Sequence, residues 1–179
     1  MAEAYIVAAA RTAGGRKGGR LAGWHPADLA AAVLDSLVER SGAAPDQIED
    51  VIMGCVMQAG EQSNNIARNA IMASKLPESV PGTSVDRQCG SSQQALHFAA
   101  QAVMSGTMDI VIAAGVEAMT RVPMGLASSL PAKNGFGWPR RPPGTSRSSC
   151  RIRKAGSSVG MPARRGCSVT TKMKPLGKV

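Results

Sequence analysis

One cysteine stands where a short run of strand-forming residues gives way to a helical pattern. Cys89 follows residues 83–87 (TSVDR) and precedes Gly90, after which apolar residues recur at helical spacing. The N–H groups and the dipole of a helix N-terminus favour a thiolate over a thiol. The small neighbours Gly90 and Ser91 leave space for a substrate carbonyl and leave backbone N–H groups available to its oxygen. Cys89 is therefore a candidate nucleophile, although composition alone favours a buried structural cysteine.

The other cysteine and the two histidines near this segment are assigned different roles. Cys55 lies in an apolar run and is predicted to be an inert core thiol. His97 lies eight residues after Cys89, about 12 Å along a helix axis, which is too far for it to act as a base. We expect His97 to be a packing residue and His25 to be a surface loop residue.

Two groups of charged residues suggest binding sites, but neither has the pattern that such a site needs. Arg16 and Lys17 lie between glycine pairs, without the G-K-[ST] ending of a phosphate-binding loop or GxGxxG spacing. A solvated turn is expected there. Glu117 and Arg121 follow the last predicted strand, near the sheet edge that often carries function in α/β proteins, and a solvated pair is expected.

The elements that must position Cys89 alternate between strands and helices. Strands are predicted at the short apolar runs 4–9, 51–57, 83–87 and 109–115. Helices are predicted between them, the first from Pro26 to the Ser41-Gly42 stop, the second from 66 to 76, and the third from Ser91 to a C-cap at Gly106. This order predicts an α/β fold with a mostly parallel sheet covered by helices.

The positive charge is confined to the C-terminal part of the chain. The formal net charge is +9, yet residues 1–135 hold 10 Lys and Arg against 12 Asp and Glu, and residues 136–179 hold 11 Lys and Arg with no acid. Residues 136–179 hold five Pro and six Gly and show no apolar periodicity, so residues 138–179 are expected to be a disordered, irregular tail. Non-specific nucleic-acid binding is one interpretation of it. A frameshift or truncation is the interpretation that we favour, because Arg, Pro, Gly, Ser and Cys dominate abruptly.

Several protein classes do not fit the sequence. The longest apolar runs, such as 110–116, are far shorter than the ~20 residues that span a bilayer. The N-terminus does not have the order of a signal or transit peptide, which together with free thiols favours a cytoplasmic location. The four cysteines show no CxxC spacing, and only two histidines accompany them. No metal site is therefore expected at Cys55, Cys89, Cys150 or Cys167.

The segment around Cys89 and four further segments together resemble the N-terminal half of thiolases, over residues 4–137. The resemblance is carried by VDRQCGSSQQA, AYIVAAARTAGGRKGGRLAG, IEDVIMGCVMQAGEQSNNIARNA, QAVMSG and DIVIAAGVEAMTRVPMG. The VDRQCGSSQQ variant is more similar to degradative thiolases of 3-ketoacyl-CoA than to the biosynthetic type. The resemblance divides the chain into a thiolase N-terminal α/β domain (1–120), the start of the family's loop region (121–137) and a non-family tail (138–179).

The resemblance implies a specific reaction. Cys89 matches the nucleophile that takes an acyl group from a 3-ketoacyl-CoA or from acetyl-CoA and passes it to CoA or to an acetyl carbanion, in cleavage or condensation. No metal and no permanently bound cofactor is implied, and CoA and acyl-CoA are substrates. A homo-oligomer, dimer or tetramer, is implied, with no membrane partner and no nucleic acid. The family's subunit has two similar α/β halves, of which this chain would supply the first.

Three motifs that complete catalysis in the family do not occur in these 179 residues. They are the histidine of G-H-P-x-G, the second cysteine of C-x-G-G-G and the asparagine of N-E-A-F; Cys150 and Cys167 lie in unrelated contexts. The leading hypothesis is therefore an acyl-CoA C-acyltransferase (thiolase) polypeptide that is incomplete as a catalyst. The alternatives are a non-catalytic fragment that associates with thiolase subunits and a nucleic-acid-binding protein that acts through its tail.

Overall fold

The computed structural model describes residues 3–127, so the predicted tail (138–179) and most of the predicted loop region lie outside the described residues. The described part contains three strands, three helices and two short 3₁₀ turns. In chain order they are α1 (Pro26–Ser41), η1 (Pro45–Gln47), β1 (Asp50–Gly54), η2 (Gly60–Gln62), α2 (Ile66–Ala73), β2 (Gly82–Val85), α3 (Ser91–Met104) and β3 (Val111–Gly115).

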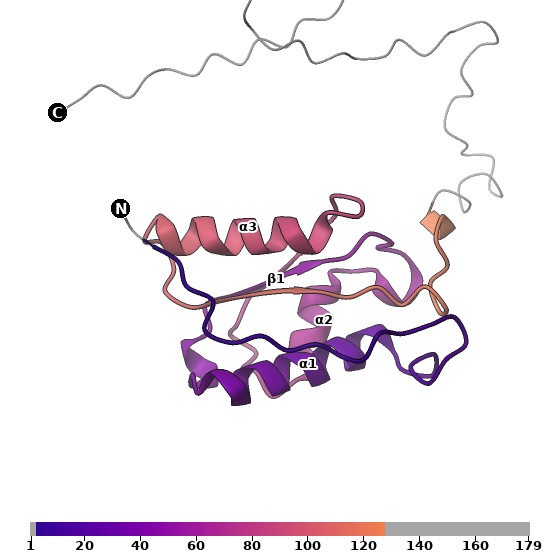
Figure 1. Cartoon of the computed structure of the whole chain (residues 1–179), viewed down its shortest axis with the longest axis horizontal. Helices are drawn as coiled ribbons and strands as arrows, with labels where there is room; N and C mark the ends of the chain where they lie inside the picture. The colour runs from indigo at the N-terminus through magenta and orange to yellow at the C-terminus, as the bar shows by residue number, and fades with distance from the viewer. Residues whose placement is uncertain (1–2, 128–179) are drawn as a thin grey trace, which may run out of the picture. The chain divides into compact units, whose positions relative to one another are not determined.

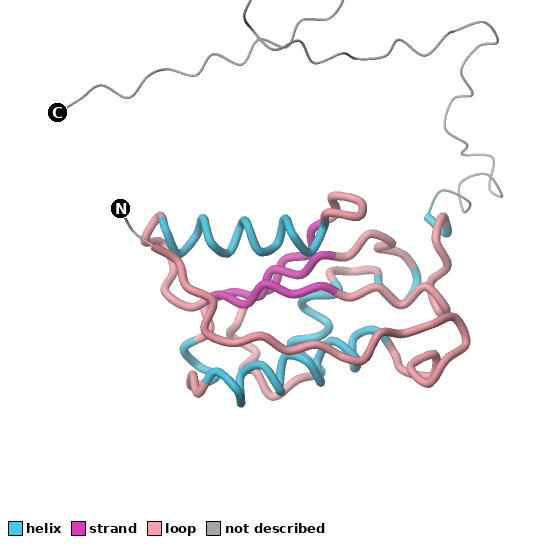
Figure 2. Tube along the Cα trace, in the orientation of Figure 1, coloured by secondary structure: helices cyan, strands magenta, loops and turns pink. Residues whose placement is uncertain are grey.

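The strands form one parallel sheet in the order β2-β1-β3. Helices α1 and α2 cover one face of the sheet, and α3 covers the other (Figure 1). The same layering is visible in the Cα trace, where the strands run between the helices (Figure 2). This arrangement confirms the predicted α/β class with a parallel sheet covered by helices.

The central strand β1 is apolar at consecutive positions because helices cover both of its faces. Val51 and Met53 belong to the core that α1 and α2 close, whereas Ile52 packs with Ala95 and Ala99 of α3. A strand that is covered on both faces needs apolar residues at every position, not at alternate ones. The largest core therefore lies between the sheet and the α1–α2 layer.

Helix boundaries follow the predicted signals. Pro26 occupies the first turn of α1, and Gly42 ends the helix in the left-handed conformation with φ 69°. Gly106 has φ 73° directly after the C-cap of α3, as a helix stop requires. No helix within residues 3–127 is long and apolar enough to cross a membrane.

The prediction of a first strand at 4–9 is wrong. The structure has no strand there, and the apolar side chains Tyr5, Ile6 and Val7 are 78%, 75% and 81% exposed. A strand exists only where a neighbouring strand accepts and donates its backbone hydrogen bonds. No described residue pairs with the backbone N–H groups of this segment, so its propensity for strand is not realised.

Candidate active site

Cys89 lies in the short turn that joins β2 to α3, at the carboxyl edge of the parallel sheet. Gly90 is the N-cap of α3, which begins at Ser91, so the predicted placement of the cysteine before a helix is confirmed. The side chain of Cys89 is exposed, and its thiol makes no hydrogen bond to any atom of residues 3–127. The sulfur is thus open to a reactant beside the positive end of a 14-residue helix.

Two polar side chains hold the turn that carries Cys89. Asp86 Oδ1 accepts from the N–H of Gln88 at 2.8 Å. The buried Ser91 hydroxyl donates to the carbonyl of Gln88 at 2.6 Å and accepts from the N–H of Arg87 at 2.9 Å. These contacts hold Gln88 in the left-handed region, with φ 53°, a conformation that costs free energy in a residue other than glycine. The surrounding bonds therefore fix the direction in which the chain enters Cys89.

The N-terminus of α3 rests directly on two glycines at the ends of adjacent strands. A Cβ added to Gly54 would lie 2.6 Å from the Cα of Ser92, and one added to Gly115 would lie 2.9 Å from the Cβ of Ser92. Gly54 and Gly115 are register partners in β1 and β3. Because neither has a side chain, the helix can approach the sheet closely at the point where it presents Cys89.

Cys55 has the opposite environment to Cys89. It follows β1, is 1% exposed, and receives a hydrogen bond from Gln62 at 3.3 Å. Burial, with the nearby carboxylates of Glu117 and Asp86, raises the pKa of Cys55 to about 12. The predicted core position of Cys55 is confirmed, and its inertness stays a prediction.

Glu117 organises this edge of the sheet, and the prediction that it forms a solvated pair with Arg121 is wrong. Its carboxylate accepts from the N–H of Val56 at 2.8 Å and from the side-chain amide of Gln62 at 2.8 Å. Gln62 is fully buried, and its carbonyl accepts from the N–H of Ala118 at 2.6 Å. No sequence pattern singles out Gln62, and the one signal for Glu117 is the position of an acid directly after a buried strand.

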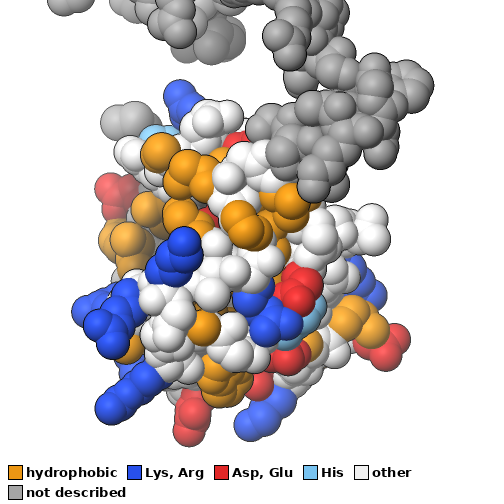
Figure 3. Space-filling view, turned by 90° about the vertical axis from the view of Figure 1, so that its right-hand side faces the viewer, with side chains coloured by type: hydrophobic (Ala, Val, Ile, Leu, Met, Phe, Trp, Pro, Cys, Tyr) orange, Lys and Arg blue, Asp and Glu red, His pale blue; other side chains and the backbone are white. Residues whose placement is uncertain are grey.

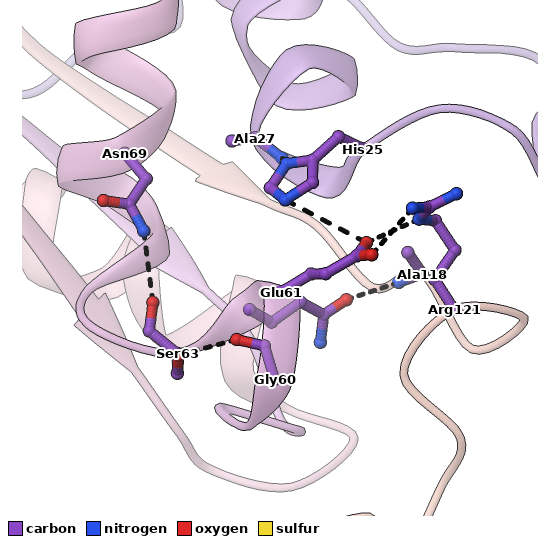
Figure 4. Close-up of polar contacts among 9 residues, drawn as sticks. His25, Ala27, Gly60, Glu61, Ser63, Asn69, Ala118 and Arg121 are labelled. Carbon is purple, nitrogen blue, oxygen red and sulfur yellow. Dashed lines mark hydrogen bonds and ion pairs between the residues drawn. The ribbon is translucent and has the colours of Figure 1, made fainter.

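Arg121 instead pairs with Glu61, and His25 lies on the other side of the same carboxylate (Figure 4). Arg121 Nη2 donates to Glu61 Oε1 at 2.7 Å, and His25 Nε2 is 4.0 Å from Oε2. The hydrogen bond from Arg121 is the main reason that the pKa of Glu61 is lowered. His25 is also the N-cap of α1, because its Nδ1 accepts from the N–H of Ala27 at 3.2 Å, so it is more than a loop residue.

The remaining candidates do not join Cys89. His97 is exposed on α3, so its predicted packing role is wrong. Arg16 and Lys17 lie in an exposed turn closed by the bond from Gly19 N–H to the carbonyl of Arg16, as expected. Within the described residues, no three His, Cys, Asp or Glu side chains lie together in a way that could hold a metal ion. The structure thus gathers Cys55, Gln62 and Glu117 with one another after β1, and within residues 3–127 neither histidine hydrogen-bonds Cys89.

Comparison with known proteins identifies similar sequences over the same region. The family model "Thiolase, N-terminal domain" matches residues 4–157, which includes residues 138–157 of the segment predicted to be a non-family tail. The boundary of that tail stays a prediction. The chain is 50% identical over 136 residues to the steroid 3-ketoacyl-CoA thiolase FadA6 of Mycobacterium tuberculosis, covering 76% of this chain and 33% of that protein.

Two further relatives are β-ketoadipyl-CoA thiolases. The protein from Pseudomonas putida is 44% identical over 137 residues, which is 75% of this chain and 34% of the relative. The protein from Escherichia coli is 48% identical over 132 residues, which is 72% of this chain and 33% of the relative. The chain therefore spans about a third of the length of the curated relatives that it matches.

Proposed function

Because this chain belongs to the thiolase family, through the N-terminal domain of that family, we propose that Cys89 is the residue that accepts an acyl group from an acyl-CoA. The observation that carries the proposal is the placement of an exposed thiol at the start of α3, in a turn fixed by Asp86 and Ser91. A thiol in this position is open to a thioester carbonyl and lies beside the N–H groups of a helix start. The buried Cys55 is not open to a substrate.

The step at Cys89 is an exchange of one thioester for another. The Cys89 thiolate attacks the carbonyl carbon of acetyl-CoA, the bond between that carbon and the CoA sulfur breaks, and CoA leaves as a thiolate that takes a proton from water. With a 3-ketoacyl-CoA, the attack falls on the keto carbon, and the bond from that carbon to the α-carbon breaks. The released acetyl-CoA carbanion must then be protonated, which needs a placed acid. Transfer of the acetyl group from acetyl-CoA to Cys89 therefore needs no placed acid, whereas a complete cycle with a 3-ketoacyl-CoA does.

The described residues supply the nucleophile but not its acid–base partners. Neither His25 nor His97 hydrogen-bonds Cys89, and His25 is committed to the N-terminus of α1 and to Glu61. General acid–base groups each contribute roughly 10²–10⁴-fold to a rate. We therefore infer that this chain performs acyl transfer to Cys89 slowly and does not turn over alone. A non-catalytic polypeptide that associates with thiolase subunits is the alternative function.

The substrate class follows from the relatives. They are named for 3-ketoacyl-CoA and β-ketoadipyl-CoA substrates, so a 3-ketoacyl-CoA is proposed as the acyl donor and CoA as the acceptor. No permanently bound cofactor is needed for this chemistry. Homo-oligomerisation and a cytoplasmic location are proposed with it.

A steady-state assay tests whether this chain is an incomplete catalyst. Thiolysis of acetoacetyl-CoA by CoA is followed by loss of its absorbance, with the Cys89→Ser variant as control. We expect no turnover above the control for the chain alone. Robust turnover that depends on CoA and disappears in Cys89→Ser would show that the chain contains its own acid–base groups, and the proposal of an incomplete catalyst would be wrong.

A further inference from the structure

Arg87 is a cation without an acidic partner, and it lies two residues before Cys89. Its side chain is exposed, and within residues 3–127 no carboxylate forms an ion pair with it. The carboxylate of the neighbouring Asp86 accepts instead from the N–H of Gln88. The positive charge of Arg87 is therefore available to an anion that comes from outside the described residues.

The position of Arg87 is fixed by its backbone bonds and by α3. Its N–H donates to the Ser91 hydroxyl at 2.9 Å, and its carbonyl accepts from the N–H of Gly90 at 3.1 Å. Its guanidinium donates through Nη1 to the side-chain carbonyl of Gln94, at the end of the first turn of α3. A guanidinium has five N–H donors in one plane, so this contact leaves enough of them to bind both oxygens of a carboxylate.

Arg87 and Cys89 are close enough to contact the two ends of one short acyl group. Their Cα atoms, two residues apart along the chain, are separated by at most about 7 Å. An acyl group that is bound to the Cys89 sulfur and has a carboxylate at its far end is therefore within reach of the Arg87 side chain. The N-terminus of α3, which lies beside both residues, also favours a negative charge.

The phosphates of CoA are the other anions of an acyl-CoA, but the long pantetheine arm separates them from the thioester carbon. A residue two positions from the nucleophile is close to the acyl chain when that carbon is at Cys89, and far from the phosphates. The face at the ends of the strands has Lys and Arg side chains beside patches of hydrophobic ones (Figure 3). Such a surface suits an acyl chain with an apolar middle and an anionic end.

We propose that Arg87 is a specificity-determining residue that binds a carboxylate at the far end of the acyl group delivered to Cys89, so that the preferred acyl donor is a CoA thioester of a dicarboxylic acid. The inference rests on the proposed role of Cys89 and goes beyond it by naming the class of acyl group. In the step itself the Cys89 thiolate attacks the thioester carbon, the bond to the CoA sulfur breaks, and CoA leaves as a thiolate that takes a proton from water. Arg87 donates hydrogen bonds to the carboxylate and transfers no proton.

Two acyl donors of equal carbon length test the proposal. The full chain is mixed with succinyl-CoA, which ends in a carboxylate, or with butyryl-CoA, which ends in a methyl group, and the acylated Cys89 peptide is measured over time. We expect succinyl transfer to be at least ~10-fold faster, because charge-assisted hydrogen bonds hold its carboxylate. Arg87→Gln should remove this preference, whereas Arg16→Gln, which removes the same charge from an exposed turn, should keep it. Equal rates for the two donors in the parent chain, or an equal fall with both donors in Arg87→Gln, would overturn the proposal.

A charged and a neutral alkylating reagent make the test independent of acyl transfer. Iodoacetate has a carboxylate and iodoacetamide has none, and with both reagents the Cys89 thiolate attacks the methylene carbon as iodide leaves. The ratio of the two rates cancels any effect of Arg87 on the amount of thiolate. We expect Arg87→Gln to lower the ratio of the iodoacetate rate to the iodoacetamide rate at least ~3-fold at low salt, and Arg87→Lys to keep it, because the charge remains.

Arg87→Lys should still lose most of the preference for succinyl-CoA, since an ammonium group does not bind both carboxylate oxygens in the way that a guanidinium does. Cys55 must stay unlabelled throughout, which shows that each variant is folded. An iodoacetate ratio that is the same in the parent chain and in Arg87→Gln would overturn the proposal. A normal fall of this ratio without acylation by either CoA donor would instead contradict the proposed function of Cys89, and the carboxylate site at Arg87 would stand.

Discussion

Gly54 and Ser92 meet so closely that the first turn of α3 occupies the space that any side chain at position 54 would need. A Cβ there would lie 2.5 Å from the carbonyl carbon of Ser91 and 2.6 Å from the Cα of Ser92. Both are backbone atoms, which cannot turn away as a side chain can. The end of β1 therefore sets the position of the helix that presents Cys89.

Replacement of Gly54 by alanine should move α3 or destabilise the sheet. We expect Gly54→Ala to lower the free energy of unfolding by about 3 kcal/mol, because the added carbon overlaps helix backbone. Urea denaturation measures the change. Gly14→Ala is the matched control, since a Cβ there has no atom within 4 Å, and its effect should stay within about 0.5 kcal/mol. Equal midpoints for the two variants would contradict the close approach.

The two described cysteines should differ sharply toward iodoacetamide. Cys89 is exposed, whereas Cys55 is buried and has a pKa of about 12, so at pH 8 only about one Cys55 in 10⁴ is a thiolate. Brief alkylation followed by peptide mapping should label Cys89 and spare Cys55 until urea is added. Comparable labelling of both in the folded chain would show that the burial of Cys55 is wrong.

Gln62 should contribute to stability far more than its residue type suggests. It is fully buried and links the carbonyl of Met57, the carboxylate of Glu117 and the N–H of Ala118. Gln62→Leu leaves these groups without their partner, and we expect a loss of about 3 kcal/mol in the free energy of unfolding. The exposed Gln101 provides the control, because Gln101→Leu should change the urea midpoint little. A Gln62→Leu variant as stable as that control would refute the network.

The Glu61–Arg121 pair should stabilise the fold only above acid pH. The folded chain lowers the pKa of Glu61, so the stabilisation is complete above the unfolded value of about 4.3 and is lost as the pH falls through the folded value. Glu61→Gln should therefore melt below the parent at pH 7 and together with it at strongly acid pH. Both side chains are about a third exposed, so the difference should also shrink in high salt. A difference that is constant across pH would exclude this origin.

The sequence predicts correctly the helices and strands whose signals lie within the element. It predicts wrongly the segment whose structure depends on a neighbouring strand far away in the sequence. The apolar run in β1 and the glycine stop of α1 could be predicted because each signal lies within the element. Residues 4–9 have the same strand propensity as β1 but lack a neighbouring strand, which propensity cannot reveal.

In the candidate site, too, local features are predictable from the sequence and long-range contacts are not. The position of Cys89 before a helix is a local property, and the sequence predicted it. The contacts of Glu117 with Val56 and Gln62 join residues about 55 to 61 positions apart, and they depend on which strands are neighbours. A single sequence does not specify which strands are neighbours, so it predicts a solvated Glu117 and does not predict the buried Gln62.

The most direct test of the account is to look for the acyl group on Cys89. The full chain is mixed with acetyl-CoA at pH 8, stopped with acid, and digested, and the Cys89 and Cys55 peptides are compared by mass spectrometry. We predict an acetyl group on Cys89, none on Cys55, release of an equal amount of free CoA, and no acetylation at this position in Cys89→Ser. An unmodified Cys89 in a folded chain, or acetylation at Cys55 to the same extent, would contradict the assignment of Cys89 as the acyl-accepting nucleophile.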